Sequence, residues 1–108
     1  MKRRTILVSV AAWLLAGSVG AAAEGDAMAG SEKAETCLGC HAVSGYYNVY
    51  PTYHVPKLGG QSAGYIQSAL TAYKSGERKH DTMHANAENL SEQDMADIAA
   101  YFAGTEQK

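Results

Sequence analysis

The sequence predicts a small all-α domain built around a bound group rather than around a large apolar core. Apolar residues recur at helical spacing in several segments, and no segment alternates as a strand does. The chain has 108 residues, and domains this short usually need a disulfide, a metal or a large bound group to be stable. Only two residues separate its two cysteines, so a bridge between them would constrain almost no loop.

The N-terminus has the pattern of a secretory signal peptide. Basic residues at 2–4 are followed by an almost entirely apolar run at 6–19 and by three alanines at 21–23. We expect cleavage after Ala23, which leaves residues 24–108 as one domain. A retained anchor is the alternative, but the run is short for a span of about 20 residues, so we expect no stable membrane insertion.

Export and charge limit the partners of the remaining domain. Residues 24–108 carry six Lys/Arg against eleven Asp/Glu, a net charge of −5 by side-chain count. Nucleic acid is therefore not an expected partner, because binding it needs a basic surface. An export signal implies an oxidising compartment, where free thiols are at risk.

The first two predicted helices have recognisable ends. Residues 26–36 form the first, with Asp26 as its N-cap and many small residues suited to close packing. The second starts at Ser62 and ends near Gly76, with apolar residues at i, i+3, i+4 and i+7 along one face.

The third helix is predicted from Ser91 onward. Asp94 follows Ser91 at capping-box spacing, and Leu90 can pack against the fourth helical residue. The buried stripe is expected at Met95, Ile98, Ala99 and Phe102, with Gly104 just past the end. The remaining segments, 42–61 and 77–89, read as loops, and loops this long in so small a domain suggest that they wrap something.

Cys37, Cys40 and His41 form the sequence C-x-x-C-H, the attachment pattern of c-type haem. Residues three apart lie on one face of a helix, so both sulfurs can reach one haem edge while the histidine that follows reaches the iron. A thioredoxin-like pair would need a βαβ context that this chain lacks. A zinc site that adds His80 and His84 matches no familiar ligand spacing.

Iron held by one histidine needs a second axial ligand or an open site. Residues 24–108 offer the candidates Met28, Met83, Met95, His54, His80 and His84. Met95 belongs to the apolar stripe of a helix, whereas Met83 lies in a polar segment where a thioether has no other reason to turn inward. We expect Met83, since His/Met ligation is common in cytochromes c.

The segments GDAMAGSEKAETCLGCHA, VPKLGGQSAGYIQSALTAYKSGERKHDTM and LSEQDMADIAAYFAG resemble bacterial class I cytochromes c. These are the short, single-haem periplasmic type that also occurs as one half of two-haem cytochromes c. The resemblance implies three to four helices wrapped around one covalent haem c, with the first and last helices crossing at Gly30 and Tyr101. It further implies Met83 as the axial ligand, a hydrogen bond from His41 to the carbonyl of Pro56, and Arg78 near the haem propionates.

One segment departs from the resemblance. Between His41 and Pro56 the chain is a few residues longer than expected and contains four tyrosines, Tyr46, Tyr47, Tyr50 and Tyr53. The rings can pad the haem edge, or they can form a docking surface, since tyrosine is enriched at interfaces.

The predicted function is periplasmic electron transfer between redox proteins, one electron at a time, without catalysis. The alternative is a cytochrome c subunit of a larger periplasmic oxidoreductase, which would dock a dehydrogenase subunit through the Tyr46–Tyr53 loop. A third hypothesis, an enzyme or gas sensor with open iron, conflicts with a methionine at position 83.

Overall fold

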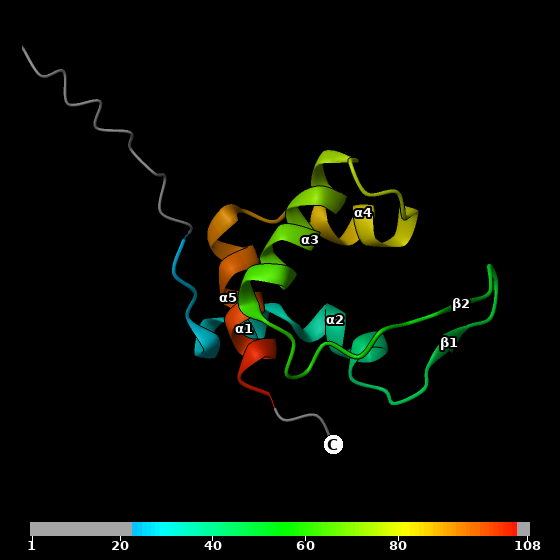
Figure 1. Cartoon of the computed structure of the whole chain (residues 1–108), viewed down its shortest axis with the longest axis horizontal. Helices are drawn as coiled ribbons and strands as arrows, with labels where there is room; N and C mark the ends of the chain where they lie inside the picture. Colours follow the sequence, from blue (N-terminus) through cyan, green and yellow to red (C-terminus); the bar gives the residue numbers. More distant parts are fainter. Residues whose placement is uncertain (1–22, 106–108) are drawn as a thin grey trace, which may run out of the picture.

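The computed structural model describes residues 23–105, which form five helices and one short hairpin (Figure 1). The predicted all-α class is confirmed, although the hairpin was not expected. No helix in the described range is long and apolar enough to cross a membrane. The predicted signal peptide, apart from its last residue, lies outside that range. The helices are α1 (Ala27–Lys33), α2 (Glu35–His41), α3 (Ala63–Ser75), α4 (Asp81–Ala87) and α5 (Glu92–Ala103), and the antiparallel strands are β1 (Tyr47–Asn48) and β2 (Tyr53–His54).

The first predicted helix, residues 26–36, is in fact two helices. Asp26 caps α1 as expected, since its carboxylate accepts the N–H groups of Met28 at 2.8 Å and Ala29 at 3.3 Å. α1 ends at Lys33, and the fully buried Ala34 caps it and leads into α2. The chain thereby changes direction, so that α1 stays against α5 while α2 carries the whole C-x-x-C-H motif.

α1 and α5 cross with their backbones in contact. Gly30 is buried, and a Cβ at this position would lie 2.0 Å from the carbonyl oxygen of Asp97 and 3.0 Å from the Cβ of Tyr101. No residue larger than glycine fits without moving one helix. The predicted crossing of the first and last helices at Gly30 and Tyr101 is confirmed.

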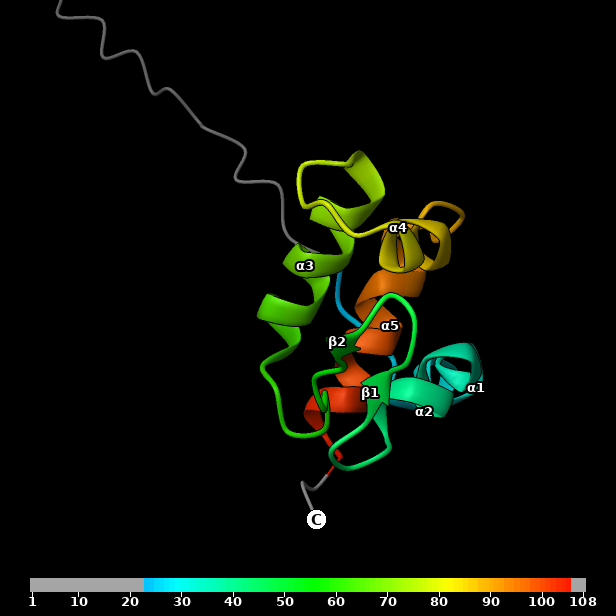
Figure 2. The ribbon, with the colours of Figure 1, turned by 90° about the vertical axis from the view of Figure 1, so that its right-hand side faces the viewer.

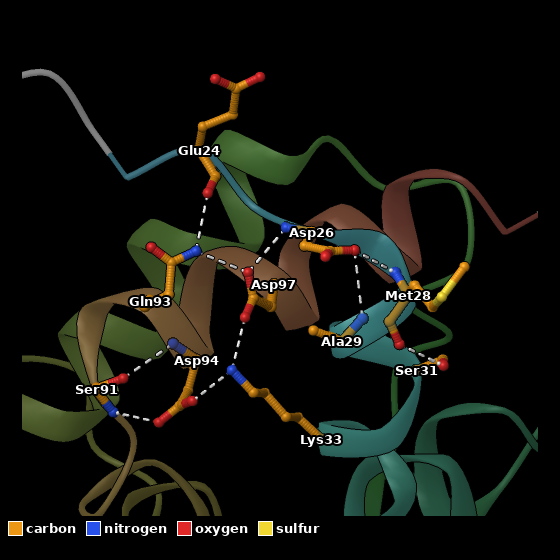
Figure 3. Close-up of polar contacts among 10 residues, drawn as sticks. All are labelled: Glu24, Asp26, Met28, Ala29, Ser31, Lys33, Ser91, Gln93, Asp94 and Asp97. Carbon is orange, nitrogen blue, oxygen red and sulfur yellow. Dashed lines mark hydrogen bonds and ion pairs between the residues drawn. The ribbon is translucent and has the colours of Figure 1, made fainter.

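A polar network ties the same two helices together (Figure 3). Lys33 on α1 lies 2.7 Å from a carboxylate oxygen of Asp94 and 2.6 Å from one of Asp97. Asp97 is buried, and it also accepts the backbone N–H of Asp26 and the amide of Gln93, both at 2.8 Å. The hydrogen bond from Lys33, with those from Asp26 and Gln93, lowers the pKa of Asp97 to about 2.

α3 and α5 begin where the sequence predicts. Ser62 accepts the N–H of Tyr65, and Gly76 closes α3 in the left-handed conformation at φ 77°. Ser91 and Asp94 form the predicted capping box, each side chain accepting the other's backbone N–H, at 3.0 and 2.9 Å.

The apolar core lies mainly between α3 and α5. All four predicted stripe residues of α5 are at most 3% exposed. Ile66 and Leu70 of α3 complete this core and also line the cleft described below. The core is therefore one wall of the site. The buried residues of the core are Ala34, Ile66, Leu70, Ala87, Met95, Ile98, Ala99 and Phe102.

Candidate functional site

A cleft of about 520 Å³ lies between α2, α3, α4 and the hairpin. Figure 1 shows α4 above and α2 below the middle of the molecule, with the hairpin projecting to the right. The volume is in the range that binds small molecules and cofactors. Its wall contains Cys37, Cys40 and His41 from α2 and Met83 from α4.

The two cysteines lie on α2 and are not joined to each other. Cys37 is partly buried against the core, whereas Cys40 is exposed. Burial raises the pKa of the Cys37 thiol. Both sulfurs belong to residues that line the same cleft, so both are available to one ligand there.

His41 is buried at the end of α2, and its ring is fixed by the backbone. Its Nδ1 lies 2.6 Å from the carbonyl oxygen of Pro56, which has no proton to give, so Nδ1 carries the proton and donates it. The lone pair is then on Nε2, the form of imidazole that binds a metal ion.

Met83 is placed by a helix that the sequence did not predict. Residues 77–89 were expected to be a loop, but 81–87 form α4, so that expectation is wrong. The start of α4 is capped by His80, whose Nδ1 accepts the N–H of Met83 at 3.3 Å. Histidine is not a usual N-cap residue, so the preferred capping residues do not predict this helix.

The other described methionines lie elsewhere. Met28 is 80% exposed on α1, and Met95 is 3% exposed within the core. Neither lines the cleft, whereas Met83 does. His54 and His80 also line it, but each ring packs against a tyrosine, with centroids 4.9 and 4.7 Å apart.

Arg78 lies at the rim of the cleft. Its guanidinium group donates to the hydroxyl of Tyr65 at 3.4 Å and lies over the ring of Tyr73, 4.8 Å from the centroid. The hydrogen bond to Tyr65 raises the pKa of Arg78. A permanent positive charge is thus held beside the cleft opening.

The tyrosine-rich segment divides into two groups. Tyr46 and Tyr53 line the cleft. Tyr47 and Tyr50 point to solvent, 59% and 93% exposed, and Val49 between them is 85% exposed. Tyr46 and Tyr53 therefore pad the cleft, whereas Tyr47 and Tyr50 form part of an exposed surface.

The donor set fits a covalently attached haem. Two thiols three residues apart, a buried imidazole with its Nε2 unprotonated and a thioether on the facing helix all line one largely apolar cleft. Within residues 23–105, no three His, Cys, Asp or Glu side chains come together as a metal site, so the zinc alternative has no ligand set there.

Comparison with known proteins agrees with this geometry. Residues 27–106 match the cytochrome c family model, so the chain belongs to the cytochrome c family. Members of this family carry covalent c-type haem and transfer electrons, and the chain is accordingly an electron carrier rather than an enzyme. The resemblance to class I cytochromes c is confirmed.

Several relatives define its place in the family. Cytochrome c-554(548) of Halomonas halodenitrificans is 45% identical over 85 residues, which cover 76% of this chain and 99% of that protein. Cytochrome c4 of Pseudomonas aeruginosa is 44% identical over 81 residues, covering 75% of this chain and 39% of that protein. The cytochrome subunit of sulfide dehydrogenase from Chlorobaculum tepidum is 30% identical over 73 residues, which cover 68% of this chain and 63% of that protein.

A solved structure shares the fold. Reduced recombinant cytochrome c4 from Pseudomonas stutzeri superimposes with a TM-score of 0.57 at 26% sequence identity, covering 80% of this chain and 53% of that chain. The chain thus spans about half or less of the cytochromes c4 that it matches.

Proposed function

We propose that the chain carries single electrons between redox proteins of the periplasm on a haem c held by α2 and α4. Cys37 and Cys40 form the thioether bonds, and His41 and Met83 are the axial ligands. One observation carries this proposal: these four side chains, from two helices far apart in sequence, line the same cleft. When bound, the haem supplies an iron ion that takes up and returns one electron.

The surrounding residues are expected to set the properties of the carrier. The hydrogen bond from His41 to Pro56 fixes the ring and increases its basicity. A thioether from Met83 favours the ferrous state and raises the potential over that of a bis-histidine site. Arg78 at the rim can neutralise a propionate carboxylate.

The ligand proposal is tested by replacing Met83 with Ala in the haem-loaded protein. We expect loss of the weak red absorption band of sulfur-ligated ferric haem, a lower potential and ready binding of carbon monoxide. Met95→Ala is the matched control, because this buried residue lies outside the cleft. It should cost about 2–5 kcal/mol of stability and leave the band in place.

Either of two results would contradict the proposal. If Met83→Ala keeps the band and the potential, the ligand is another residue. If the unmutated protein binds carbon monoxide rapidly, the iron has an open site and the protein is a sensor or an enzyme.

The periplasmic location rests on the N-terminal sequence. The basic, apolar and small-residue order of positions 2–23 is that of a cleavable export signal. Thioether bonds to haem would leave neither cysteine as a free thiol in the oxidising compartment.

A second candidate function is that of a haem subunit in a periplasmic oxidoreductase. Two observations favour it: the relative from C. tepidum is a sulfide dehydrogenase subunit, and Tyr47, Val49 and Tyr50 form an exposed apolar hairpin tip. A dehydrogenase subunit would dock on the Tyr46–Tyr53 loop. Gentle purification of the native protein separates the two functions, since a carrier migrates alone and a subunit does not. In the second case Tyr50→Ser should release the partner.

A further inference from the structure

The start of α4, which carries Met83, is held by side chains from two other elements. We propose that His80 and Tyr53 are positioning residues that keep the thioether of Met83 at the cleft, His80 by capping α4 and Tyr53 by bracing His80. This inference rests on the proposed ligation by Met83 and assigns a specific task to one tyrosine of the unusually long loop.

The cap on α4 acts directly at the ligand residue. His80 has extended backbone, and its Nδ1 accepts the N–H of Met83 while its carbonyl oxygen accepts the N–H of His84 at 2.8 Å. Nδ1 is therefore unprotonated, and Nε2 carries the proton. α4 has seven residues, far fewer than an isolated helix needs. Its first turn thus depends on the cap and on contacts with the rest of the fold.

Two aromatic rings from different elements contact the ring of His80 edge-on. Tyr53 of β2 meets it edge-on, with centroids 4.7 Å apart and planes at 82°. Tyr73 of α3 meets it at 6.2 Å and 77°. Such edge-to-face pairs stabilise a fixed ring orientation, so two rings help to hold in place the nitrogen that caps Met83.

Tyr53 also reaches α4 through its hydroxyl. Its oxygen lies 3.2 Å from the hydroxyl oxygen of Thr82. The hairpin thus contacts two positions, 80 and 82, on either side of the first residue of α4, and Figure 2 shows the hairpin just below α4. Tyr53, His80, Thr82 and Met83 all line the cleft, which places the brace at the site itself.

Loosening the brace should show as easier displacement of Met83. An external ligand reaches the sixth position only when the start of α4 moves away, and its apparent affinity is scaled by the population of that open state. Removing an N-cap costs about 1 kcal/mol, which corresponds to about a fivefold rise in the open population.

The test is a titration of the ferric, haem-loaded protein with imidazole. Binding is monitored through the loss of the absorption band of sulfur-ligated haem. His80→Ala should bind imidazole about fivefold more tightly than the unmutated protein. His80→Asn keeps a capping side chain without the ring, and we expect it to recover part of that change. Tyr53→Ala should also tighten binding, whereas Tyr53→Phe, which keeps the ring, should stay within about twofold.

Two controls separate positioning from general loss of stability. Ser62→Ala removes the N-cap of α3, a residue outside the cleft lining. It should lower the unfolding midpoint about as much as His80→Ala and leave imidazole affinity unchanged. In the double variant, Tyr53→Ala should add at most about a twofold change to His80→Ala, because the ring of Tyr53 acts through His80 and only its hydroxyl contacts Thr82.

The outcomes are distinguishable. The inference is overturned if His80→Ala and Ser62→Ala bind imidazole equally, or if the effects of Tyr53→Ala and His80→Ala simply multiply. Either result leaves the proposed ligation by Met83 intact. If the unmutated protein shows no sulfur band, ligation by Met83 fails first and the inference fails with it.

Discussion

Replacing Gly30 by Ala tests how far the stability of this domain depends on direct backbone contact between α1 and α5. An added Cβ would lie 2.0 Å from the carbonyl oxygen of Asp97, and ordinary van der Waals contact begins near 3.4 Å. The obstacle is helical backbone, which cannot rotate away as a side chain can. The two helices must therefore separate by roughly 1.4 Å, the difference between those distances.

That separation would also lengthen the polar contacts between the helices. The hydrogen bonds that Asp97 accepts from Lys33 and from the N–H of Asp26 are 2.6 and 2.8 Å long in the unmutated protein. Overpacking costs about 1–3 kcal/mol, and we expect about 3 kcal/mol because these bonds weaken as well. Alanine recovers about 1 kcal/mol through its higher helix propensity. The expected net loss is about 2 kcal/mol, or roughly 8–16 °C in Tm for a domain of this size.

The assay is unfolding of the haem-loaded protein by guanidinium and by heat, monitored by circular dichroism. Gly64→Ala is the matched control, because Gly64 lies in the first turn of α3 and an added Cβ there meets nothing within 4 Å. It should be stabilising by about 0.5–1 kcal/mol. Equal midpoints for Gly30→Ala and Gly64→Ala would refute the close packing of α1 on α5.

Three further predictions follow from the charge network, the attachment site and the N-terminus. Because the pKa of Asp97 is lowered from 3.8 to about 2, its ionised carboxylate stabilises the fold at pH values above 3.8, and this contribution is lost as the pH falls toward about 2. Asp97→Asn should therefore be less stable at neutral pH, and its Tm should fall less steeply with acidification. An unchanged dependence of Tm on pH in the acid range would contradict this. Denatured protein should keep its haem through acid–organic extraction, whereas the Cys37→Ser, Cys40→Ser double variant should release it; haem that extracts freely from the unmutated protein rules out thioether attachment. Mature protein from the periplasm should begin at Glu24, and N-terminal sequencing that finds Met1 in a membrane fraction would contradict export with cleavage.

Features determined by neighbouring residues could be predicted from the sequence. The capping box at Ser91 and Asp94, the apolar stripe of α5 and the stop at Gly76 each depend on side chains within one or two turns of the helix they define. The C-x-x-C-H motif is equally local, so the expectation of covalent haem needed no structure.

Features determined by distant residues needed the tertiary structure. The sequence around Ala34 favours helix throughout, and the break there follows from α1 packing against α5 while α2 turns to the cleft. The helix around Met83 was missed because its N-cap is a histidine whose ring is held by Tyr53 and Tyr73.

The tyrosine-rich loop shows the same division between local and distant causes. Composition alone left cleft padding and a docking surface as equal interpretations for all four rings. Pairing of β1 with β2 folds the segment back on itself, and its packing beside the cleft decides the role of each ring: Tyr53 lies at the cleft wall, while Tyr47 and Tyr50 remain exposed to solvent. The sequence thus determined which chemistry the protein carries. Only long-range packing decided which side chains surround it, because that choice depends on residues dozens of positions away.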